Sequence, residues 1–545
     1  MSTGGVHRSA DDPIRIAELP AGAGRIGLSF CPGKHAPRLG GGAWQRDLHE
    51  DLARIRAWGA DTVVTLIEGH EFDALRVNEL PEAVRAAGMG WHHLPIRDGG
   101  VPDARFDWRW RYAGLQLRQS LRKGGSVFVH CRGGLGRAGM VASRLLVEFG
   151  SGPREAIATV RAVRRGAVET SAQEDWVARS RPRGVPLDER ADRELACLLG
   201  GTLGDAMGYR VEFASRARIL REHGPQGIRL EECRGRLVAS DDTQMALFTL
   251  EGMERALAAG DAEEPEDGAL VESIRQAYLD WLQTQDAGAR SPVGMLARHP
   301  EMNAARAPGM TCLDALRRGG RGSPDRPIND SKGCGGVMRT APIGFLDARF
   351  SDARVFDLGL RAGALTHGHP DGWLPSGAMA LMVRLLASGA DWQATAREAI
   401  GRVAGAAPQG SDTETLLRKA VQLAASKPCS VDALVQLGQG WVGEEALAIG
   451  LYAAMSTDRF EECLALATNH DGDSDSTASI AGQLFGACHG LLALPVEPVH
   501  RIDLLEPLLD TAARWHALHE DGARDATGRA RTQTDDTTTH SKGDL

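Results

Sequence analysis

The chain has 545 residues, which is too many for one ordinary hydrophobic core, so two or three domains are expected. Hydrophobic residues make up 42% of the sequence and charged residues 25%, a composition that argues against a largely disordered or membrane-embedded protein. The formal net charge of −9 argues against broad nucleic-acid binding, although a local basic patch stays possible.

The nine cysteines are scattered singly, with no Cys-x-x-Cys pair and an odd total. This pattern predicts reduced thiols rather than a disulfide framework. The amino terminus lacks the apolar core of a secretory signal, and no later run approaches the length of a membrane span. We therefore expect a cytoplasmic protein with no membrane partner.

A polar lead over 1–12 is expected to be disordered. Beyond it, β-rich runs alternate with stretches that place apolar residues at helical spacing. Strands are predicted over 61–68, 92–97 and 126–130, and helices over 47–58, 80–87 and 140–149. This alternation predicts an α/β domain over 13–180, with a sheet flanked by helices.

The segment 181–193 carries two prolines and many charges between apolar stretches, and it is the predicted linker. Over 194–515, β-rich runs nearly vanish and Ala- and Leu-rich helical patterns dominate, which predicts an all-α second domain in a multidomain chain. The acidic stretch 260–272 is expected to form a surface loop. The residues 516–545 are predicted to be a polar disordered tail.

The motif HCRGGLGR, His130 to Arg137, lies between a predicted strand and a predicted helix. Backbone N–H groups in such a glycine-rich turn converge on an anion, and the helix amino terminus adds positive potential. The same field favours a thiolate at Cys131, which is the candidate nucleophile, and the planar fork of Arg137 can bind two phosphate oxygens. The predicted phosphate-binding residues are Arg132, Gly133, Gly134, Leu135 and Gly136.

A leaving oxygen needs a proton, and the candidate donor is Asp98 in the loop PIRDGGVPD, with Asp103 as its competitor. These residues resemble the cysteine-dependent protein phosphatases, within them the dual-specificity group similar to the cyclin-dependent-kinase-associated phosphatase. The resemblance covers about 25–180 and includes CPGK at 31–34 and VETSAQEDW, whose Gln173 would help to place the hydrolytic water.

That resemblance implies a phosphocysteine intermediate that water then cleaves. The family usually has Ser or Thr after the loop arginine, and the hydroxyl assists breakdown of the intermediate, whereas this chain has Ala138. Turnover is therefore expected to be slow. Two alternatives stay open: a phosphate-binding but inactive reader module, and a merely structural strand-to-helix turn.

Two acidic clusters follow in the second half, SDDT at 240–243 and GDSDST at 472–477, each before an apolar helical run. Aspartates at helix amino termini can be simple caps. Two such clusters, each flanked by Ser or Thr, favour a metal site instead, because clustered carboxylates repel unless a cation neutralises them. Oxygen ligands without nearby His and Cys predict two Mg²⁺ ions, with Mn²⁺ as a possible replacement.

These clusters, read with LLGGTLGDAMGYRVEF, NDSKGCGGVMRTAPIG and LTHGHPDG, closely resemble the ADP-ribosylglycohydrolase family, including the dinitrogenase-reductase-activating glycohydrolases, over about 194–515. The resemblance implies an all-α fold and a binuclear magnesium centre. It assigns the metal ligands to Ser240, Asp241, Asp242, Asp473, Asp475 and Ser476.

By the same resemblance, Glu212 approaches the metals or the attacking water. The ADP-ribose contacts fall on Gly333, Cys334, Gly335, Gly336 and His367. Some family members have Asn where this chain has Cys334, and a lone His at a helix end is more often structural.

The sequence thus predicts a bifunctional hydrolase. Its expected substrates are an ADP-ribosylated protein, nucleic acid or small molecule, and a phosphorylated protein or small molecule. One alternative is that the phosphatase-like domain is a phospho-reader that targets the glycohydrolase. Another is that the second domain acts on a different ribosyl or nucleotide glycoside.

Overall fold

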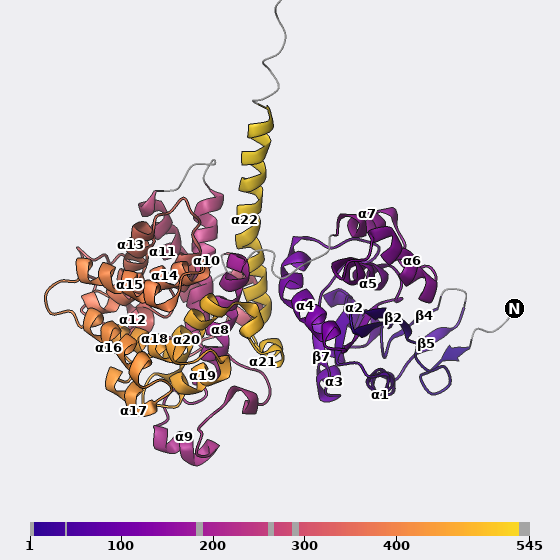
Figure 1. The fold of residues 1–545 in the computed structure, drawn as a ribbon, viewed down its shortest axis with the longest axis horizontal. Helices are drawn as coiled ribbons and strands as arrows, with labels where there is room; N and C mark the ends of the chain where they lie inside the picture. Colours follow the sequence, from indigo (N-terminus) through magenta and orange to yellow (C-terminus); the bar gives the residue numbers. More distant parts are fainter. Residues whose placement is uncertain (1–4, 39–40, 181–188, 260–265, 286–293, 533–545) are drawn as a thin grey trace, which may run out of the picture. The chain divides into compact units, whose positions relative to one another are not determined.

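The computed structural model describes residues 5–38, 41–180, 189–259, 266–285 and 294–532. The chain forms two compact units, Met1–Asp188 and Glu189–Leu545, which Figure 1 shows as ribbons. The amino-terminal unit has a sheet with helices and the carboxyl-terminal unit is mostly helical, so the predicted fold class is confirmed.

A five-stranded sheet with the order β2-β3-β8-β6-β7 forms the centre of the amino-terminal unit, and only β2 runs antiparallel to its neighbour. A small second sheet has the order β1-β5-β4. The strands are β1 (Val6–His7), β2 (Ala17–Ala21), β3 (Gly24–Phe30), β4 (His35–Pro37), β5 (Ala43–Gln45), β6 (Thr62–Thr65), β7 (Gly90–His93) and β8 (Ser126–Cys131). The helices are α1 (Leu48–Trp58), α2 (Gly69–Leu75), α3 (Leu80–Ala86), α4 (Ala104–Arg122), α5 (Gly136–Glu148), α6 (Pro153–Val163) and α7 (Ser171–Arg179).

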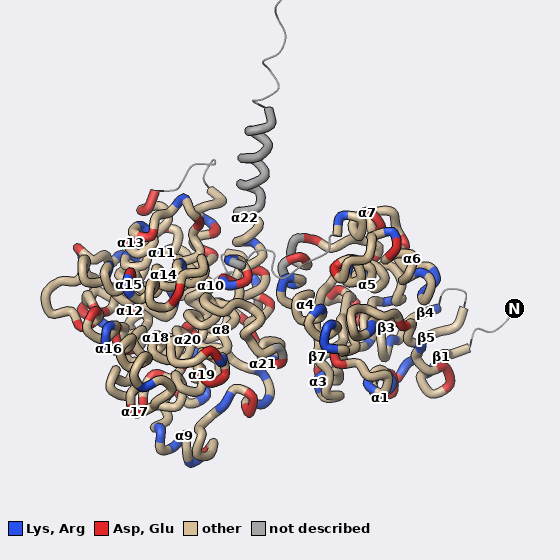
Figure 2. The backbone as a smooth tube through the Cα atoms, in the orientation of Figure 1, with Lys and Arg blue, Asp and Glu red and all other residues tan. Residues whose placement is uncertain are grey.

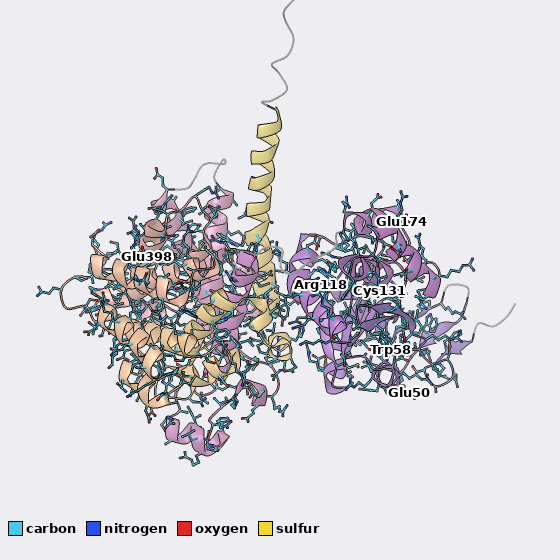
Figure 3. The ribbon with its side chains drawn as sticks, in the orientation of Figure 1. Glu50, Trp58, Arg118, Cys131, Glu174 and Glu398 are labelled. Atoms are coloured by element: carbon cyan, nitrogen blue, oxygen red, sulfur yellow. The ribbon has the colours of Figure 1, made fainter. Side chains whose placement is uncertain are left out.

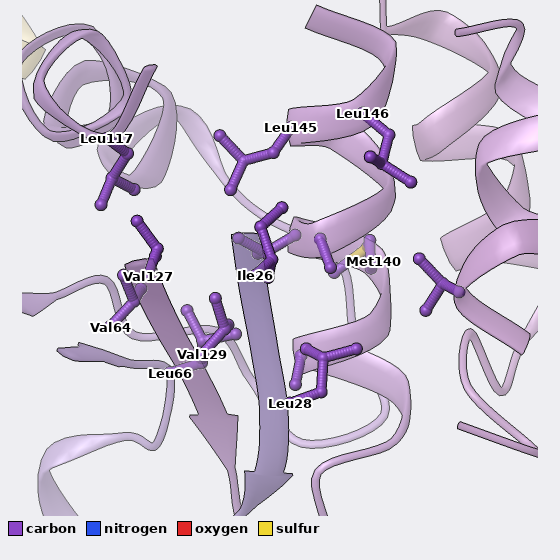
Figure 4. Close-up of a cluster of buried hydrophobic side chains, with 14 of the residues drawn as sticks. Ile26, Leu28, Val64, Leu66, Leu117, Val127, Val129, Met140, Leu145 and Leu146 are labelled. Atoms are coloured by element: carbon purple, nitrogen blue, oxygen red, sulfur yellow. The ribbon is translucent and has the colours of Figure 1, made fainter. Parts of the chain in front are cut away.

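Successive side chains of a strand point to opposite faces of the sheet, and both faces of this sheet are apolar. Val127 and Val129 of β8 join a buried cluster with residues of α4 to α7, shown in Figure 4. Phe128, between them, joins a second cluster with residues of α1, α2 and α3. Helices therefore cover both faces, which leaves the carboxyl ends of the parallel strands for a site.

Two predicted boundaries in this unit are wrong. The strand expected over 92–97 is β7, which spans Gly90–His93. Beyond it, the backbone nitrogens of Leu94 and Ile96 still donate to the carbonyl oxygens of Thr65 and Leu66 before the chain reaches the Asp98 loop. The helix expected over 140–149 begins earlier, at Gly136, so the last residues of the phosphate loop are already the first helical turn. The sequence patterns also missed β2, β3 and the long helix α4.

The carboxyl-terminal unit is built from helices, and the strand-like pairing that its described residues show is limited to isolated bridges such as Gly333 with Val442. Its helices are α8 (Glu189–Gly208), α9 (Arg216–His223), α10 (Asp241–Ala258), α11 (Asp267–Thr284), α12 (Met310–Arg317), α13 (Asp352–Ala364), α14 (Pro370–Ala387), α15 (Trp392–Ala406), α16 (Thr413–Ser426), α17 (Val431–Leu434), α18 (Gly443–Ser456), α19 (Phe460–Thr468), α20 (Ser474–His489), α21 (Val496–His500) and α22 (Leu505–Thr532).

Four expectations about irregular segments need correction. Within the lead predicted to be disordered over 1–12, Val6–His7 forms β1, held by pairing with β5 rather than by apolar burial. Residues 189–193 of the predicted linker begin α8, where Ala191 is buried, and 181–188 lie outside the described residues.

The acidic stretch is helical from Asp267, where α11 begins and buries Leu270, and 260–265 lie outside the described residues. The predicted tail is helical up to Thr532, as the continuation of α22, which buries Trp515 in its earlier part. Residues 533–545 lie outside the described part of the chain.

All nine cysteines are free thiols in the structure. Along the described residues, we find no helix with the length and apolar character needed to cross a bilayer. Basic and acidic residues are interspersed along the chain in both units, as Figure 2 shows.

Helices α8 and α20 approach so closely that glycine is required where they meet. A Cβ atom added at Gly204 would lie 2.0 Å from the carbonyl oxygen of Ala478, and one at Gly208 would lie 2.2 Å from that of Ser474. Backbone atoms cannot move aside as a flexible side chain can. The close approach seats the amino terminus of α20, with its aspartates, against α8.

Replacing Gly204 by Ala should therefore lower the free energy of unfolding of the helical unit by about 1–3 kcal/mol through overpacking. Gly401→Ala is the matched control, because a Cβ atom at Gly401 in α15 meets no atom within 4 Å. It should be neutral or raise the free energy by up to about 1 kcal/mol. Urea unfolding followed by far-ultraviolet circular dichroism measures both, and equal stabilities of the two variants would contradict the packing argument.

Candidate active sites

Cys131 ends β8, the central strand of the amino-terminal sheet, and is labelled in Figure 3. Its Sγ lies 3.2 Å from the backbone nitrogen of Gly134, which donates a hydrogen bond to it. Gly134 has a φ of +69°, and a Cβ atom there would lie 2.2 Å from the backbone of Ser29. The loop can therefore fold under the sulfur only with glycine at this position.

The guanidinium of Arg137 is buried beside this loop. It donates to both carboxylate oxygens of Glu71, at 2.6 and 3.1 Å, and to the carbonyl oxygen of Ile96 at 3.0 Å. Burial alone would raise the pKa of Glu71, but the hydrogen bond from Arg137, a backbone hydrogen bond within the Glu68 turn and the nearby positive charges together hold the pKa below its usual value. Glu71 thus fixes the fork of Arg137 as an ion pair, and no local motif in the sequence pointed to Glu71.

Asp98 reaches the same guanidinium, with its Oδ1 2.9 Å from Nη2 of Arg137, and its side chain is 62% exposed. The competing candidate, Asp103, caps α4 and accepts a hydrogen bond from the backbone nitrogen of Phe106 at 2.9 Å. Asp98 is therefore the carboxylate beside the loop, whereas Asp103 has a structural partner.

Gln173 in α7 is buried, and its Nε2 donates to the carbonyl oxygen of Gly100 at 3.1 Å. Its Oε1 would lie 2.9 Å from a Cβ atom at Gly136, so the amide stands between the phosphate loop and the Asp98 loop. Ala138 is fully buried in the hydrophobic cluster of α5, where a methyl group occupies the position after Arg137. The predicted phosphatase residues thus come together at one edge of the sheet.

In the carboxyl-terminal unit, five carboxylates from three segments line one pocket of about 210 Å³. They are Glu212, Asp241, Asp242, Asp473 and Asp475. Ligand oxygens of Glu212, Asp473 and Asp475 lie within 4.8 Å of one another, an arrangement that could hold a metal ion. The pocket is also lined by Ser476 and by Gly333, Cys334, Gly335 and His367.

Burial and mutual repulsion disfavour the charged forms of these groups. They raise the pKa values of Asp241, Asp242 and Asp473 well above the usual range, and they raise the pKa of Glu212 to about 8. The Oδ2 atom of Asp242 and the Oε2 atom of Glu212 are buried and accept no hydrogen bond from any residue that the structure describes. Unpaired carboxylate oxygens that face one pocket fit a hard divalent cation.

Asp205 of α8 organises the first acidic cluster, although the sequence reasoning did not select it. One carboxylate oxygen of Asp205 accepts from the backbone nitrogen of Ser240 at 2.8 Å, and the other accepts from Oγ1 and N of Thr243 at 2.5 and 3.1 Å. Burial and the nearby Asp475 raise the pKa of Asp205 to about 7. Asp205 holds the turn from which Asp241 and Asp242 project.

Two residues of the predicted site do not line this pocket. Ser240 instead caps α10, and its Oγ accepts from the backbone nitrogen of Asp242 at 3.2 Å. Gly336 faces α14, where a Cβ atom would lie 2.6 Å from the carbonyl oxygen of Gly372. Both positions are set by helix packing, which the motif spacing alone does not reveal.

Cys334 donates from Sγ to Oδ2 of Asp473 at 2.8 Å, so the thiol contacts the acidic cluster directly. His367 is buried, and burial together with Arg339 lowers its pKa to about 3, so the imidazole is neutral. At the rim, Trp441 lines the pocket and its ring stacks on Phe213, with 6.1 Å between the ring centroids. The sequence reasoning did not select either aromatic residue.

A strand that ends in a Cys-x5-Arg loop defines a cysteine-phosphatase-like domain, and a helical unit with a carboxylate-lined pocket defines a glycohydrolase-like domain. The ADP-ribosylglycohydrolase family model matches residues 186–527, more than half of the chain, and the chain belongs to this family. A second model, described as the DSP-PTPase phosphatase domain of Swiss Army Knife proteins, matches residues 38–177.

Individual relatives match one unit each. Cyclin-dependent kinase inhibitor 3 of Rattus norvegicus is 30% identical over 31% of this chain and 80% of its own length. The ADP-ribosyl-[dinitrogen reductase] glycohydrolase of Rhodospirillum rubrum is 27% identical over 57% of this chain and 91% of its own. The ADP-ribosylarginine hydrolase Tri1 of Pseudomonas putida is 24% identical over 61% and 80%, respectively.

The raised carboxyl pKa values predict a stability that depends on pH and on metal. Without metal, the folded protein keeps protons on Asp205 and Glu212 up to pH values near 7 and 8, whereas unfolded carboxyl groups lose them near pH 4. The folded state therefore binds more protons than the unfolded state. The stability that this proton binding gives the folded state is lost as the pH rises from about 4 to 8.

We expect the melting temperature of chelator-treated protein to fall between pH 5.5 and pH 8, and millimolar Mg²⁺ or Mn²⁺ to restore much of that loss. In Asp242→Asn the metal effect should shrink. Thermal unfolding at both pH values measures the melting temperatures. A melting temperature at pH 8 that is unchanged by added metal would contradict the prediction.

Proposed function

We propose that this chain is a bifunctional hydrolase that removes ADP-ribose from a substrate with its carboxyl-terminal unit and phosphate with its amino-terminal unit. The observation that carries the first activity is the convergence of five carboxylates on one pocket, two of them with unpaired buried oxygens. The observation that carries the second is the Cys131 loop with Arg137 and Asp98 beside it.

We propose that Asp241, Asp242, Asp473 and Asp475, with Ser476, hold two Mg²⁺ ions that Mn²⁺ can replace. The donor set supports this, because carboxylate and hydroxyl oxygens suit hard divalent ions. These residues would hold the ions where they could orient the ribose hydroxyls and favour deprotonation of the attacking water. We assign Ser240 to the helix cap that supports the neighbouring aspartates, since its Oγ already accepts from Asp242.

We propose that Glu212 loses its own proton when cations bind beside it, and that its carboxylate then accepts the proton of the water that attacks the anomeric carbon, as the bond to the acceptor breaks. Its half-buried carboxylate has one oxygen without a partner among the described residues, and it belongs to the cluster with Asp473 and Asp475. Gly333 and Gly335 would let the diphosphate approach the backbone closely, and His367 would face the distal ribose as a neutral imidazole.

For the acceptor, we propose arginine as the first linkage to test. The name of the Pseudomonas putida relative describes an ADP-ribosylarginine hydrolase, and that relative is 24% identical to this chain over 341 residues. The reaction would hydrolyse the N-glycosidic bond between the ribose and the guanidinium group. We also propose a cytoplasmic location, because nine free thiols suit a reducing compartment.

In the amino-terminal unit, we propose that the Cys131 sulfur attacks the phosphorus of a phosphomonoester while Asp98 gives a proton to the leaving oxygen. Arg137, held by Glu71, would bind two of the phosphoryl oxygens. Water placed by Gln173 would then cleave the phosphocysteine and release inorganic phosphate. Ala138 offers no hydroxyl to this second step, so we expect breakdown of the intermediate to limit the rate.

The glycohydrolase proposal is tested by release of ADP-ribose from an ADP-ribosylated arginine peptide, measured by chromatography with Mg²⁺ and with a chelator. Asp241→Ala and Asp475→Ala should each reduce the rate at least about 100-fold, more than loss of an outer-shell partner of a metal typically does. Asp314→Ala, which removes an exposed carboxylate paired with Arg317, is the matched control. Chelator-insensitive release would contradict the proposal.

The phosphatase proposal is tested with alkyl and aryl phosphates on the intact chain. Cys131→Ser should abolish turnover, and Asp98→Asn should lower kcat for alkyl phosphates by about 10² to 10⁴, with a smaller loss for p-nitrophenyl phosphate, whose leaving group needs no proton. Asp103→Asn is the control, since asparagine also caps helices well. Equal losses in Asp98→Asn and Asp103→Asn would contradict the assignment of the acid, and absence of turnover in the wild type would favour a phosphate reader.

A further inference from the structure

Three consecutive carbonyl oxygens of the phosphate loop, those of Arg132, Gly133 and Gly134, accept hydrogen bonds from cationic side chains outside the loop. Nζ of Lys34 lies 3.1 Å from the oxygen of Arg132. Nη2 of Arg164 lies 3.1 Å from the oxygen of Gly133, and its Nε lies 3.0 Å from that of Gly134. Two cations from distant parts of the sequence therefore hold the outer edge of the loop.

The direction of these carbonyls also fixes the direction of the amides. A trans peptide unit is planar, with its oxygen and its hydrogen on opposite sides, and the described residues contain no cis peptide bond. Carbonyls that point outward at Arg132, Gly133 and Gly134 turn the N–H groups of Gly133, Gly134 and Leu135 inward. The N–H of Gly134 does point inward, since it donates to Sγ of Cys131 at 3.2 Å.

Lys34 is held firmly enough to act in this way. Its side chain is buried at the end of CPGK, and its ammonium lies over the rings of Phe30 and Trp44, 4.4 and 4.7 Å from their centroids. Such contacts stabilise a cation that has lost part of its hydration. Because Lys34 is 98 residues from Arg132 in the sequence, spacing alone could not have connected them.

The charged and titratable groups that face Lys34 belong to three segments. Cys31 precedes it, Arg46 follows β5, and Cys131 and Arg132 belong to the phosphate loop. Burial lowers the pKa of Lys34 to about 8, although the two sulfurs oppose this change. Burial raises the pKa of the Cys31 thiol far above its usual range, so Cys31 stays neutral at pH 7–9.

Arg164 supports the other half of the loop. It follows α6, is partly exposed, and makes both of its contacts to the loop through two nitrogens of one rigid fork. A guanidinium fixes two neighbouring carbonyls in a way that a single ammonium cannot. Lys34 and Arg164 thus hold adjacent peptide units of the loop through their carbonyl oxygens.

We propose that Lys34 and Arg164 are positioning residues that turn the amides of Gly133, Gly134 and Leu135 towards a bound oxyanion. This inference rests on the proposed phosphatase function and adds to it two residues outside the Cys-x5-Arg motif. The amides are donors that are already oriented before the anion arrives. The partial positive charge on their hydrogens is reinforced by the two cations that bind the opposite side of the same peptide units.

The test measures tungstate binding by calorimetry to the full chain carrying Cys131→Ser, which removes the nucleophilic thiol and its titration. Adding Lys34→Met or Arg164→Met should weaken the affinity about tenfold at pH 7.5, a loss of about 1.4 kcal/mol. Lys123→Met and Arg165→Met, at exposed positions of the same unit, are the matched controls and should leave the affinity unchanged. Melting temperatures are recorded for every variant.

The pH dependence separates positioning from general stability. In the Cys131→Ser parent, tungstate affinity should fall between pH 7 and pH 9 as Lys34 loses its proton. This fall should disappear in Lys34→Met, whose affinity is already low, and in Lys34→Arg, which stays charged. A merely structural role would lower the melting temperature without removing the pH-dependent step.

The inference is overturned if Lys34→Met and Arg164→Met bind tungstate as the parent does, or if the parent does not bind tungstate. If the methionine variants fail to fold, Lys34→Arg carries the test, and a pH profile that still falls as in the parent counts against the inference. Turnover assays on the unmodified chain distinguish the two claims. Absence of turnover with intact tungstate effects rejects the phosphatase alone, whereas turnover without any variant effect rejects the positioning role alone.

Discussion

Repulsion among the buried carboxylates of the helical pocket is the constraint on which the carboxyl-terminal unit depends. Asp241 and Asp242 reach the pocket from the first turn of α10, and Asp473 and Asp475 reach it from the start of α20. Helix amino termini favour the charged forms, but burial, followed by repulsion from neighbouring carboxylates, keeps the pKa values of Asp241, Asp242 and Asp473 well above their usual range. The glycine contacts between α8 and α20 nevertheless hold the groups together. A bound cation would neutralise these carboxylates and so stabilise the folded arrangement.

The site of the amino-terminal unit has the opposite electrostatic character, because its loop amides, helix amino terminus and guanidinium create a positive potential that favours an anion. The central strand β8 delivers Cys131 to a helix amino terminus, and Glu71 fixes the guanidinium of Arg137 beside it. Here a carboxylate orients the cationic ligand, whereas in the helical unit Asp205 orients the turn that carries the anionic ligands. In both units the residues that touch substrate are proposed to work through partners that lie elsewhere in the sequence.

Hydrophobic periodicity was enough to predict the fold class of each unit. The motifs could be recognised because Cys131 to Arg137 and the two aspartate clusters are each short contiguous segments. The supporting residues could not be predicted in this way. Glu71 is 66 residues from Arg137, and Asp205 is 35 residues from Ser240, so tertiary folding alone brings each pair together. Val6–His7 was wrongly predicted to be disordered for a related reason. This two-residue strand is held by backbone pairing with β5, which produces no hydrophobic pattern in the sequence.

The central claim is that the helical pocket binds divalent cations through its aspartates. Titration of the chelator-treated full chain with Mn²⁺, followed by electron paramagnetic resonance of the free ion, tests this claim without requiring a substrate. The account predicts two bound ions per chain and loss of tight binding in a chain carrying Asp242→Asn and Asp475→Asn, with Asp314→Asn behaving as wild type. Failure to bind Mn²⁺, or binding that survives the double substitution unchanged, would contradict it.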